Sequence, residues 1–69
     1  MNEDIIKGRW KEIKGKVQQH WSKLTDDQVG QMQGSYTELE GLLQKHYGLE
    51  KDHARKEIDA FIENNKLRE

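Results

Sequence analysis

The side chains best suited to chemistry are three histidines and one pair of adjacent carboxylates. His20, His46 and His53 lie on three different segments, and none of them stands at metal-ligand spacing from another. Asp26 and Asp27 are neighbours in the sequence. Neighbours on a helix point about 100° apart, which does not suit an acid–base pair. The spacing therefore predicts no catalytic residue and no metal site.

The glycines and serines also lack the sequence context of known catalytic or phosphate-binding loops. None of the six glycines belongs to a P-loop or a dinucleotide-binding fingerprint, and no serine has the surroundings of a nucleophile elbow. The chain has no cysteine, so it has neither a disulfide nor a thiolate ligand. We therefore expect a protein that is not an enzyme and that needs no cofactor.

Basic residues concentrate in the first third of the chain. Residues 1–24 carry six Lys or Arg against three Asp or Glu, whereas residues 25–69 carry six against ten. One interpretation is that the aliphatic stems cover the edges of an apolar stripe while the charged ends stay in water. The other is a surface for nucleic acid or another anionic partner. The residues of that surface would be Lys7, Arg9, Lys11, Lys14 and Lys16.

A capping box at Thr25 is the clearest start signal in the chain. The Thr25 hydroxyl can accept a hydrogen bond from the Gln28 N–H, and the Gln28 side chain can accept one from the Thr25 N–H. Leu24 and Val29 stand at the two positions of a hydrophobic staple. These residues predict a helix that begins directly after Thr25.

Helical periodicity extends along the rest of the chain. An apolar stripe recurs every three or four residues from Ile6 to Leu24 and predicts one long basic helix over residues 3–23. Shorter helices are predicted over residues 26–33, 36–47 and 51–64. The expected boundary signals are a second capping box of Ser35 and Glu38 and C-terminal caps at Gly34 and Gly48. The sequence has no proline and no strand alternation. It predicts an all-α bundle of about four helices in one domain over residues 1–69, with residues 63–69 frayed.

The inward faces of these helices define the predicted core. In the third helix either Leu42 or Leu43 completes the stripe, and we place Leu42 in the core. Trp10 and Trp21 are eleven residues apart on one face and are expected as core anchors rather than as a base-stacking platform. The predicted core is Trp10, Ile13, Val17, Trp21, Leu24, Val29, Leu39, Leu42, Tyr47, Ile58 and Phe61.

Composition places the chain near the border between folded and disordered proteins. Of 69 residues, 32% are hydrophobic and 36% charged, and the net charge is −1. A chain of this length buries only about 60% of its unfolded surface, so we expect a folded but soft domain. The alternative is a mostly disordered, solvating chain. No apolar run approaches the roughly 20 residues of a membrane span, and the first residues lack the pattern of a secretory signal. We therefore expect a cytoplasmic protein.

A succession of motifs resembles a known family over nearly the whole chain. The matching residues are Gly8-Arg9-Trp10, Lys14-Gly15-Lys16-Val17, the run from Trp21 to Asp27, Gly34, Leu39, Gly41, Gln44, Tyr47-Gly48, Ala54, Ile58 and Phe61. In this register the chain resembles the CsbD-like family of small bacterial stress-response proteins. It departs from the family pattern at Ser22, where glycine is common, and over residues 35–37, which are less charged.

The resemblance implies a four-helix fold similar to SAM-domain-like bundles, in a bacterial cytoplasmic protein induced under general stress. It implies no enzyme activity and supplies no functional residues to carry over. The low hydropathy and abundant glycine also resemble hydrophilins, which are linked to dehydration tolerance.

Three hypotheses for function follow from the residues and the resemblance. The leading one is a hydrophilic protectant or small interaction module. The second is a weak nucleic-acid binder that uses the basic face of the first helix. The third is a partner-binding or self-associating bundle with part of the first helix's apolar stripe exposed, although a monomer is favoured over an obligate oligomer and no partner is identified. Burial of Trp10, Ile13 and Trp21 within one chain would favour the protectant.

Overall fold

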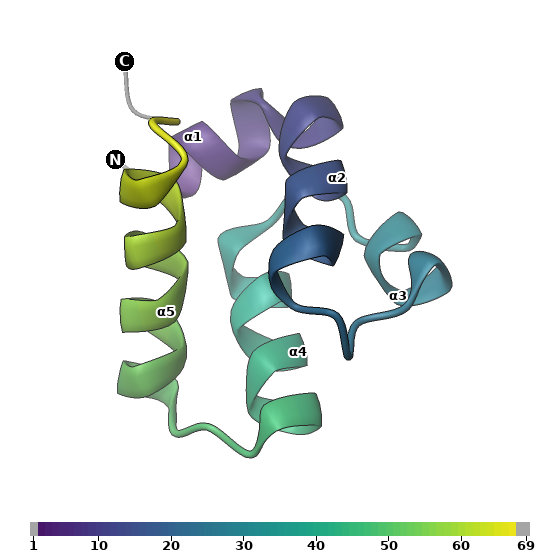
Figure 1. Cartoon of the computed structure of the whole chain (residues 1–69), viewed down its shortest axis with the longest axis vertical. Coiled ribbons are helices and arrows are strands. Elements are labelled where there is room, and N and C mark those ends of the chain that lie inside the picture. Colours follow the sequence, from purple (N-terminus) through teal and green to yellow (C-terminus); the bar gives the residue numbers. More distant parts are fainter. Residues whose placement is uncertain (1, 68–69) are drawn as a thin grey trace.

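Five α-helices follow one another in the computed structural model, which describes residues 2–67 (Figure 1). They are α1 (Asn2–Gly8), α2 (Trp10–His20), α3 (Asp26–Gly30), α4 (Tyr36–Tyr47) and α5 (Lys51–Asn64). No strand occurs among the described residues. The all-α class predicted from periodicity is therefore confirmed.

Helices α4 and α5 lie side by side, α1 crosses one end of this pair, and α2 and α3 cover the other side of α4 (Figure 1). The turn between α4 and α5 begins at Gly48, which has φ +66° and ψ 26°. This left-handed conformation is strained for residues with a side chain, so glycine ends α4 here as the sequence predicts.

The single helix predicted over residues 3–23 is wrong, because the chain bends at Arg9 (φ −121°, ψ 23°) and α2 ends at His20. The Arg9 N–H still binds Ile5 O at 3.0 Å, and the Ile13 N–H binds Arg9 O at 2.9 Å, so the break is a sharp bend rather than a loop. A straight helix of that length would span about 30 Å. The molecule measures 30 × 25 × 18 Å. The bend keeps both Ile6 and Ile13 within one small core.

The segment between α3 and α4 also differs from the prediction. Helix α3 ends at Gly30 rather than at residue 33, so Gly34 is not its C-terminal cap. Gly34 instead lies in the following turn with φ +84°, and a Cβ there would stand 2.9 Å from the Trp10 Cβ. Glycine is needed at this position for two reasons, the backbone angle and the close passage of the turn over Trp10.

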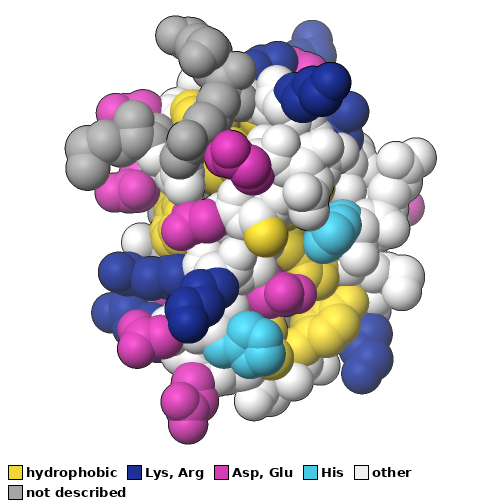
Figure 2. Space-filling model, turned by 60° about the vertical axis from the view of Figure 1, so that its left-hand side comes forward, with side chains coloured by type: hydrophobic (Ala, Val, Ile, Leu, Met, Phe, Trp, Pro, Cys, Tyr) yellow, Lys and Arg dark blue, Asp and Glu magenta, His cyan; other side chains and the backbone are white. Residues whose placement is uncertain are grey.

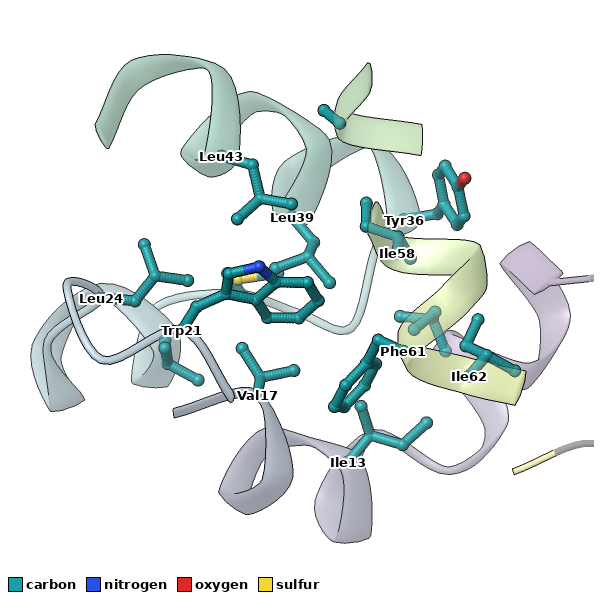
Figure 3. Close-up of a cluster of buried hydrophobic side chains, with 14 of the residues drawn as sticks. Ile13, Val17, Trp21, Leu24, Tyr36, Leu39, Leu43, Ile58, Phe61 and Ile62 are labelled. Carbon is teal, nitrogen blue, oxygen red and sulfur yellow. The ribbon is translucent and has the colours of Figure 1, made fainter. Parts of the chain in front are cut away.

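Apolar side chains from all five helices meet in one core (Figure 3). Trp21, directly after α2, lies among Val17, Leu24 and Leu39, with Phe61 of α5 nearby. Eight of the eleven predicted core residues are buried, and the partly buried ones are Trp10, Leu42 and Tyr47. The placement of Leu42 in the core is corrected, because Leu43 is the buried residue of the two. In α4, Leu43 shares the face of Leu39, whereas Leu42 points about 100° away from Leu43.

The last described residues are more ordered than the expected frayed end. Leu67 is buried, its N–H binds Ile62 O at 3.0 Å, and its carbonyl accepts a hydrogen bond from the Arg9 guanidinium at 2.7 Å. One local hydrogen bond and one distant one thus hold Leu67 against the core. The rest of the predicted frayed segment, residues 68 and 69, lies outside the described residues.

Candidate functional site

The five basic residues of the predicted anionic-partner surface do not form one patch. Lys7 lies on α1, beyond the bend, whereas the other three lysines lie on α2. Lys11 and Lys14 are exposed and about 60° apart around α2, because three residues advance a helix by about 300°. Lys16 is half-buried and lies about 160° away from Lys14. Only Lys11 and Lys14 therefore share an exposed flank of α2.

Arg9 is occupied within the chain. Its Nη1 donates to Leu67 O at 2.7 Å. Its Nε and Nη2 donate to the Glu12 carboxylate at 3.0–3.2 Å, which makes an ion pair across one helical turn. The guanidinium thus fixes the bend at one end of the molecule. A phosphate would have to displace these contacts to bind it.

The capping box at Thr25 is present in full. The Gln28 N–H donates to Thr25 Oγ1 at 3.2 Å, and the Thr25 N–H donates to Gln28 Oε1 at 3.0 Å. Gln28 Nε2 also lies 2.9 Å from Nε2 of His46 in α4. Because Gln28 Oε1 accepts from a backbone N–H, its amide nitrogen must donate, so His46 Nε2 accepts and carries no proton. The cap of α3 is thereby tied to α4, a link between distant residues that no local motif indicates.

The second capping box is formed only in half. The Glu38 N–H lies 3.4 Å from Ser35 Oγ, which caps α4 as predicted. The Glu38 carboxylate does not return to the Ser35 N–H; its Oε1 accepts from the Gln33 N–H at 3.1 Å. The bend of the chain at Gly34 brings the Gln33 N–H toward this carboxylate. The predicted reciprocal box is therefore corrected to a single cap.

A polar cluster between α4, α5 and the start of α1 is absent from the sequence predictions. The Tyr36 hydroxyl donates to Asp59 at 3.0 Å and also lies 3.3 Å from the Arg55 carbonyl. Arg55 Nε donates to the Glu40 carboxylate at 2.7 Å, and Asn2 Nδ2 donates to Asp59 at 2.6 Å. One signal could have revealed part of it. Glu40 is four residues after Tyr36 on the inward face of α4, where an unpaired carboxylate would be costly.

Electrostatics within this cluster follow from burial and from the paired charges. Burial raises the pKa of Tyr36, and the hydrogen bond to the Asp59 carboxylate raises it further. The hydrogen bond to Glu40 raises the pKa of Arg55. Among the described residues, every buried side-chain nitrogen or oxygen has a hydrogen-bond partner. The cluster therefore joins helices and leaves no buried polar atom aimed at a ligand.

The histidines lie in three separate environments. The His20 ring packs edge-on against Trp21 at 4.5 Å between centroids and lies 5.2 Å from Phe61. His46 contacts Gln28, and His53 is exposed on α5. In the described part of the chain, no group of three or more His, Asp or Glu residues could hold a metal ion. Figure 2 shows a small hydrophobic area bordered by two histidines, with acidic and basic side chains interspersed around it.

Two of the open grooves formed by the described residues border α4. One, of about 380 Å³, lies between α1 and the start of α4 and is lined by polar and charged residues, among them Glu3, Asp4 and Lys7. The other, of about 330 Å³, lies between α3 and α4 and includes Met32 and Leu42. Over residues 2–67, no helix is long and apolar enough to cross a membrane.

Comparison with known proteins gives consistent matches over most of the chain. The CsbD-like family model matches residues 4–56. The UPF0337 protein YjbJ of Escherichia coli K12 is 43% identical over 68 residues, which cover 99% of each chain. A UPF0337 protein of Bordetella pertussis is 40% identical over 94% of this chain and 98% of its own, and one of Xanthomonas axonopodis is 46% identical over 88% of each. None of these names carries an activity.

Proposed function

The chain belongs to the CsbD-like family, and on this premise we propose that it is a non-enzymatic bacterial stress-response protein of the cytoplasm. It acts through its hydrated surface, as a protectant of other macromolecules or as a small interaction module. No reaction is part of this role, and its specificity is low. The proposal accounts for a folded chain whose buried polar groups serve its own packing.

The observation that carries the proposal is the burial of the long apolar stripe. Ile13 is 0% exposed and Trp21 is 3% exposed, and Trp10 packs against the same core. A helix that recruits partners would present these side chains to solvent. Here the stripe serves the fold of a single chain, which supports a protectant over a partner-binding first helix.

The surface supports the same role. More than a third of the residues are charged, and the mean hydropathy is −1.18. Both signs are interspersed on the face shown in Figure 2. A surface of this kind stays hydrated and offers little apolar area for aggregation. Placed between drying proteins, such molecules keep transiently exposed apolar surfaces apart.

Drying or freezing a labile enzyme with and without this protein tests the proposal. We expect the enzyme to retain more activity with the protein than with an equal mass of an inert globular protein. The gain should rise with the molar ratio of protein to enzyme, because separation of molecules depends on number. Protection equal to that of the inert protein would refute the protectant function.

Nucleic-acid binding is the second candidate, and the shared exposed flank of Lys11 and Lys14 is the observation that favours it. Two observations weigh against it, the occupied guanidinium of Arg9 and the acidic remainder of the chain. Binding through phosphate contacts weakens steeply with salt. Titration of labelled single- and double-stranded DNA at low and physiological salt would show this dependence. The Lys11→Gln/Lys14→Gln variant should no longer bind the DNA. Absence of binding at low salt would exclude this function.

A further inference from the structure

The outward face of α4 carries four residues at helical spacing. Glu38, Gly41, Leu42 and Lys45 occupy positions i, i+3, i+4 and i+7, which share one face of a helix. This face lies away from the buried Leu39 and Leu43. Three of the four residues are exposed, and Leu42 is half-buried. Because Met32, in the segment after α3, flanks them, the face forms one wall of the groove of about 330 Å³ between α3 and α4.

The order of these residues is self-complementary under a two-fold axis. From the N-terminal to the C-terminal end, the face presents an acidic residue, a glycine, a leucine and a basic residue. In an antiparallel copy the order is reversed, so the acidic residue faces the basic one and the glycine faces the leucine. A second α4 laid antiparallel would therefore set Glu38 opposite Lys45 of the other copy. Leu42 would lie opposite the other copy's Gly41. Both relations occur twice, as an isologous contact requires, and the antiparallel helix dipoles add to the attraction.

The groups on this face are available for such a contact. Lys45 makes no ion pair within residues 2–67. Glu38 uses only Oε1, which accepts from the Gln33 N–H at 3.1 Å. A Cβ at Gly41 would meet nothing within 4 Å, so packing within the chain does not require glycine there. Glycine inside a helix costs up to about 1 kcal/mol relative to alanine, and it allows another backbone to approach closely.

We propose that this face of α4, with the groove beside α3, binds a second copy of the chain as a two-fold dimer. The occupant is identified by charge and shape, since the face complements itself at both its charged ends and its centre. Two helical turns bury less than the roughly 1,200–2,000 Å² of a stable interface, so the dimer forms only at high protein concentration. The dimer does not depend on the proposed function and differs from association through the stripe of α2, which is buried.

Sedimentation equilibrium of the full chain over a concentration series tests the proposal. We expect the average mass of the wild type to rise with concentration. Lys45→Glu and Glu38→Lys should each weaken dimerisation about tenfold or more, because two attractive pairs become repulsive. An equimolar mixture of the two variants should recover the wild-type association, since every pair across that dimer is again of opposite charge. Lys11→Glu is the matched control, with the same charge change on α2 and no expected effect.

A second variant separates association from folding. Gly41→Gln places a side chain in open space, so the monomer should keep its fold and melt at a higher temperature, while the close helix approach and the dimer are lost. Retained helicity by circular dichroism identifies the folded variants. A wild type that stays monomeric at millimolar concentration would overturn the proposal. The proposal would also be overturned if Lys45→Glu and Gly41→Gln both associate like the wild type. The same holds if the equimolar mixture of Lys45→Glu and Glu38→Lys fails to recover the wild-type association.

Discussion

Gln28 connects two helices and one turn through a single amide. Its oxygen accepts from the Thr25 N–H, and its nitrogen donates to His46 of α4. The backbone N–H of Gln28 in turn binds Thr25 Oγ1. The start of α3 is therefore held both by its own cap and by its neighbour. At the residue scale, the polar side chains of this small protein stabilise contacts between elements as well as the elements themselves.

Thr25→Ala removes the hydroxyl that caps α3. Loss of an N-cap costs about 0.5–2 kcal/mol, and in a domain of this size about 1 kcal/mol lowers the melting temperature by roughly 4–8 °C. Thermal melts followed by circular dichroism measure the change. Thr37→Ala is the matched control, because Thr37 is exposed at the start of α4. A melt of Thr25→Ala that matches the wild type would show that the cap does not contribute.

Tyr36 should make the folded state sensitive to alkaline pH. Its pKa is raised by burial and by Asp59, so the folded state keeps the phenol proton where the unfolded chain loses it at a pKa of about 10. The stabilisation is complete below this pH and is lost as the pH rises above it. The free energy of unfolding should fall by up to about 1.4 kcal/mol per pH unit above pH 10.

Urea denaturation between pH 8.5 and about 11.5 measures this dependence. In Tyr36→Phe, the free energy of unfolding should fall less steeply with pH in the alkaline range. In Tyr47→Phe, the matched change in the other tyrosine, this fall should remain. If the free energy of unfolding falls equally steeply with pH in the wild type and in Tyr36→Phe, Tyr36 is not the residue that causes the alkaline sensitivity.

At the scale of elements, the bend at Arg9 and the turn at Gly34 depend on each other. The bend separates α1 from α2 and sets Trp10 at the start of α2. The turn before α4 then crosses Trp10 so closely that a Cβ at Gly34 would approach within 2.9 Å. The absence of a side chain at Gly34 thus allows the turn before α4 to pack directly against Trp10.

Substitution by alanine should therefore have opposite effects on stability at Gly34 and at Gly15. Gly34→Ala forces a side chain into a left-handed backbone conformation and against Trp10, and it should destabilise the protein by about 1–3 kcal/mol. Gly15→Ala adds a Cβ in open space within α2 and should stabilise it by up to about 1 kcal/mol. Chemical denaturation of both variants gives the two signs. A Gly34→Ala protein as stable as the wild type would contradict the close passage over Trp10.

At the scale of the whole molecule, contacts near both ends of the chain close the fold. Asn2 donates to Asp59 of α5, and Leu67 binds Arg9 through its carbonyl while its side chain is buried. A chain of 69 residues has few core side chains, so each terminal contact is a large share of the total stability. The bend at Arg9 and the last described residue, Leu67, stabilise each other although they are 58 positions apart in the sequence.

Leu67→Ala tests the ordered end. Removing a buried leucine side chain costs about 2–5 kcal/mol, so this variant should melt well below the wild type. Leu49→Ala, which truncates a half-buried leucine in the α4–α5 turn, should cost less. If Leu67→Ala melts like the wild type, the end is frayed as the sequence alone predicts.

The sequence by itself determined the helical class and the local boundaries at Thr25, Ser35 and Gly48. These features depend on residues within three or four positions of one another, so a local pattern is sufficient to predict them. The tertiary structure alone decided the bend at Arg9, the burial of Leu43 rather than Leu42, the place of Leu67 and the pairing of Tyr36 with Asp59. It also decided that Arg9 is occupied while Lys11 and Lys14 remain exposed. Each of these outcomes joins residues distant in sequence, such as Arg9 and Leu67, and only packing brings such residues together.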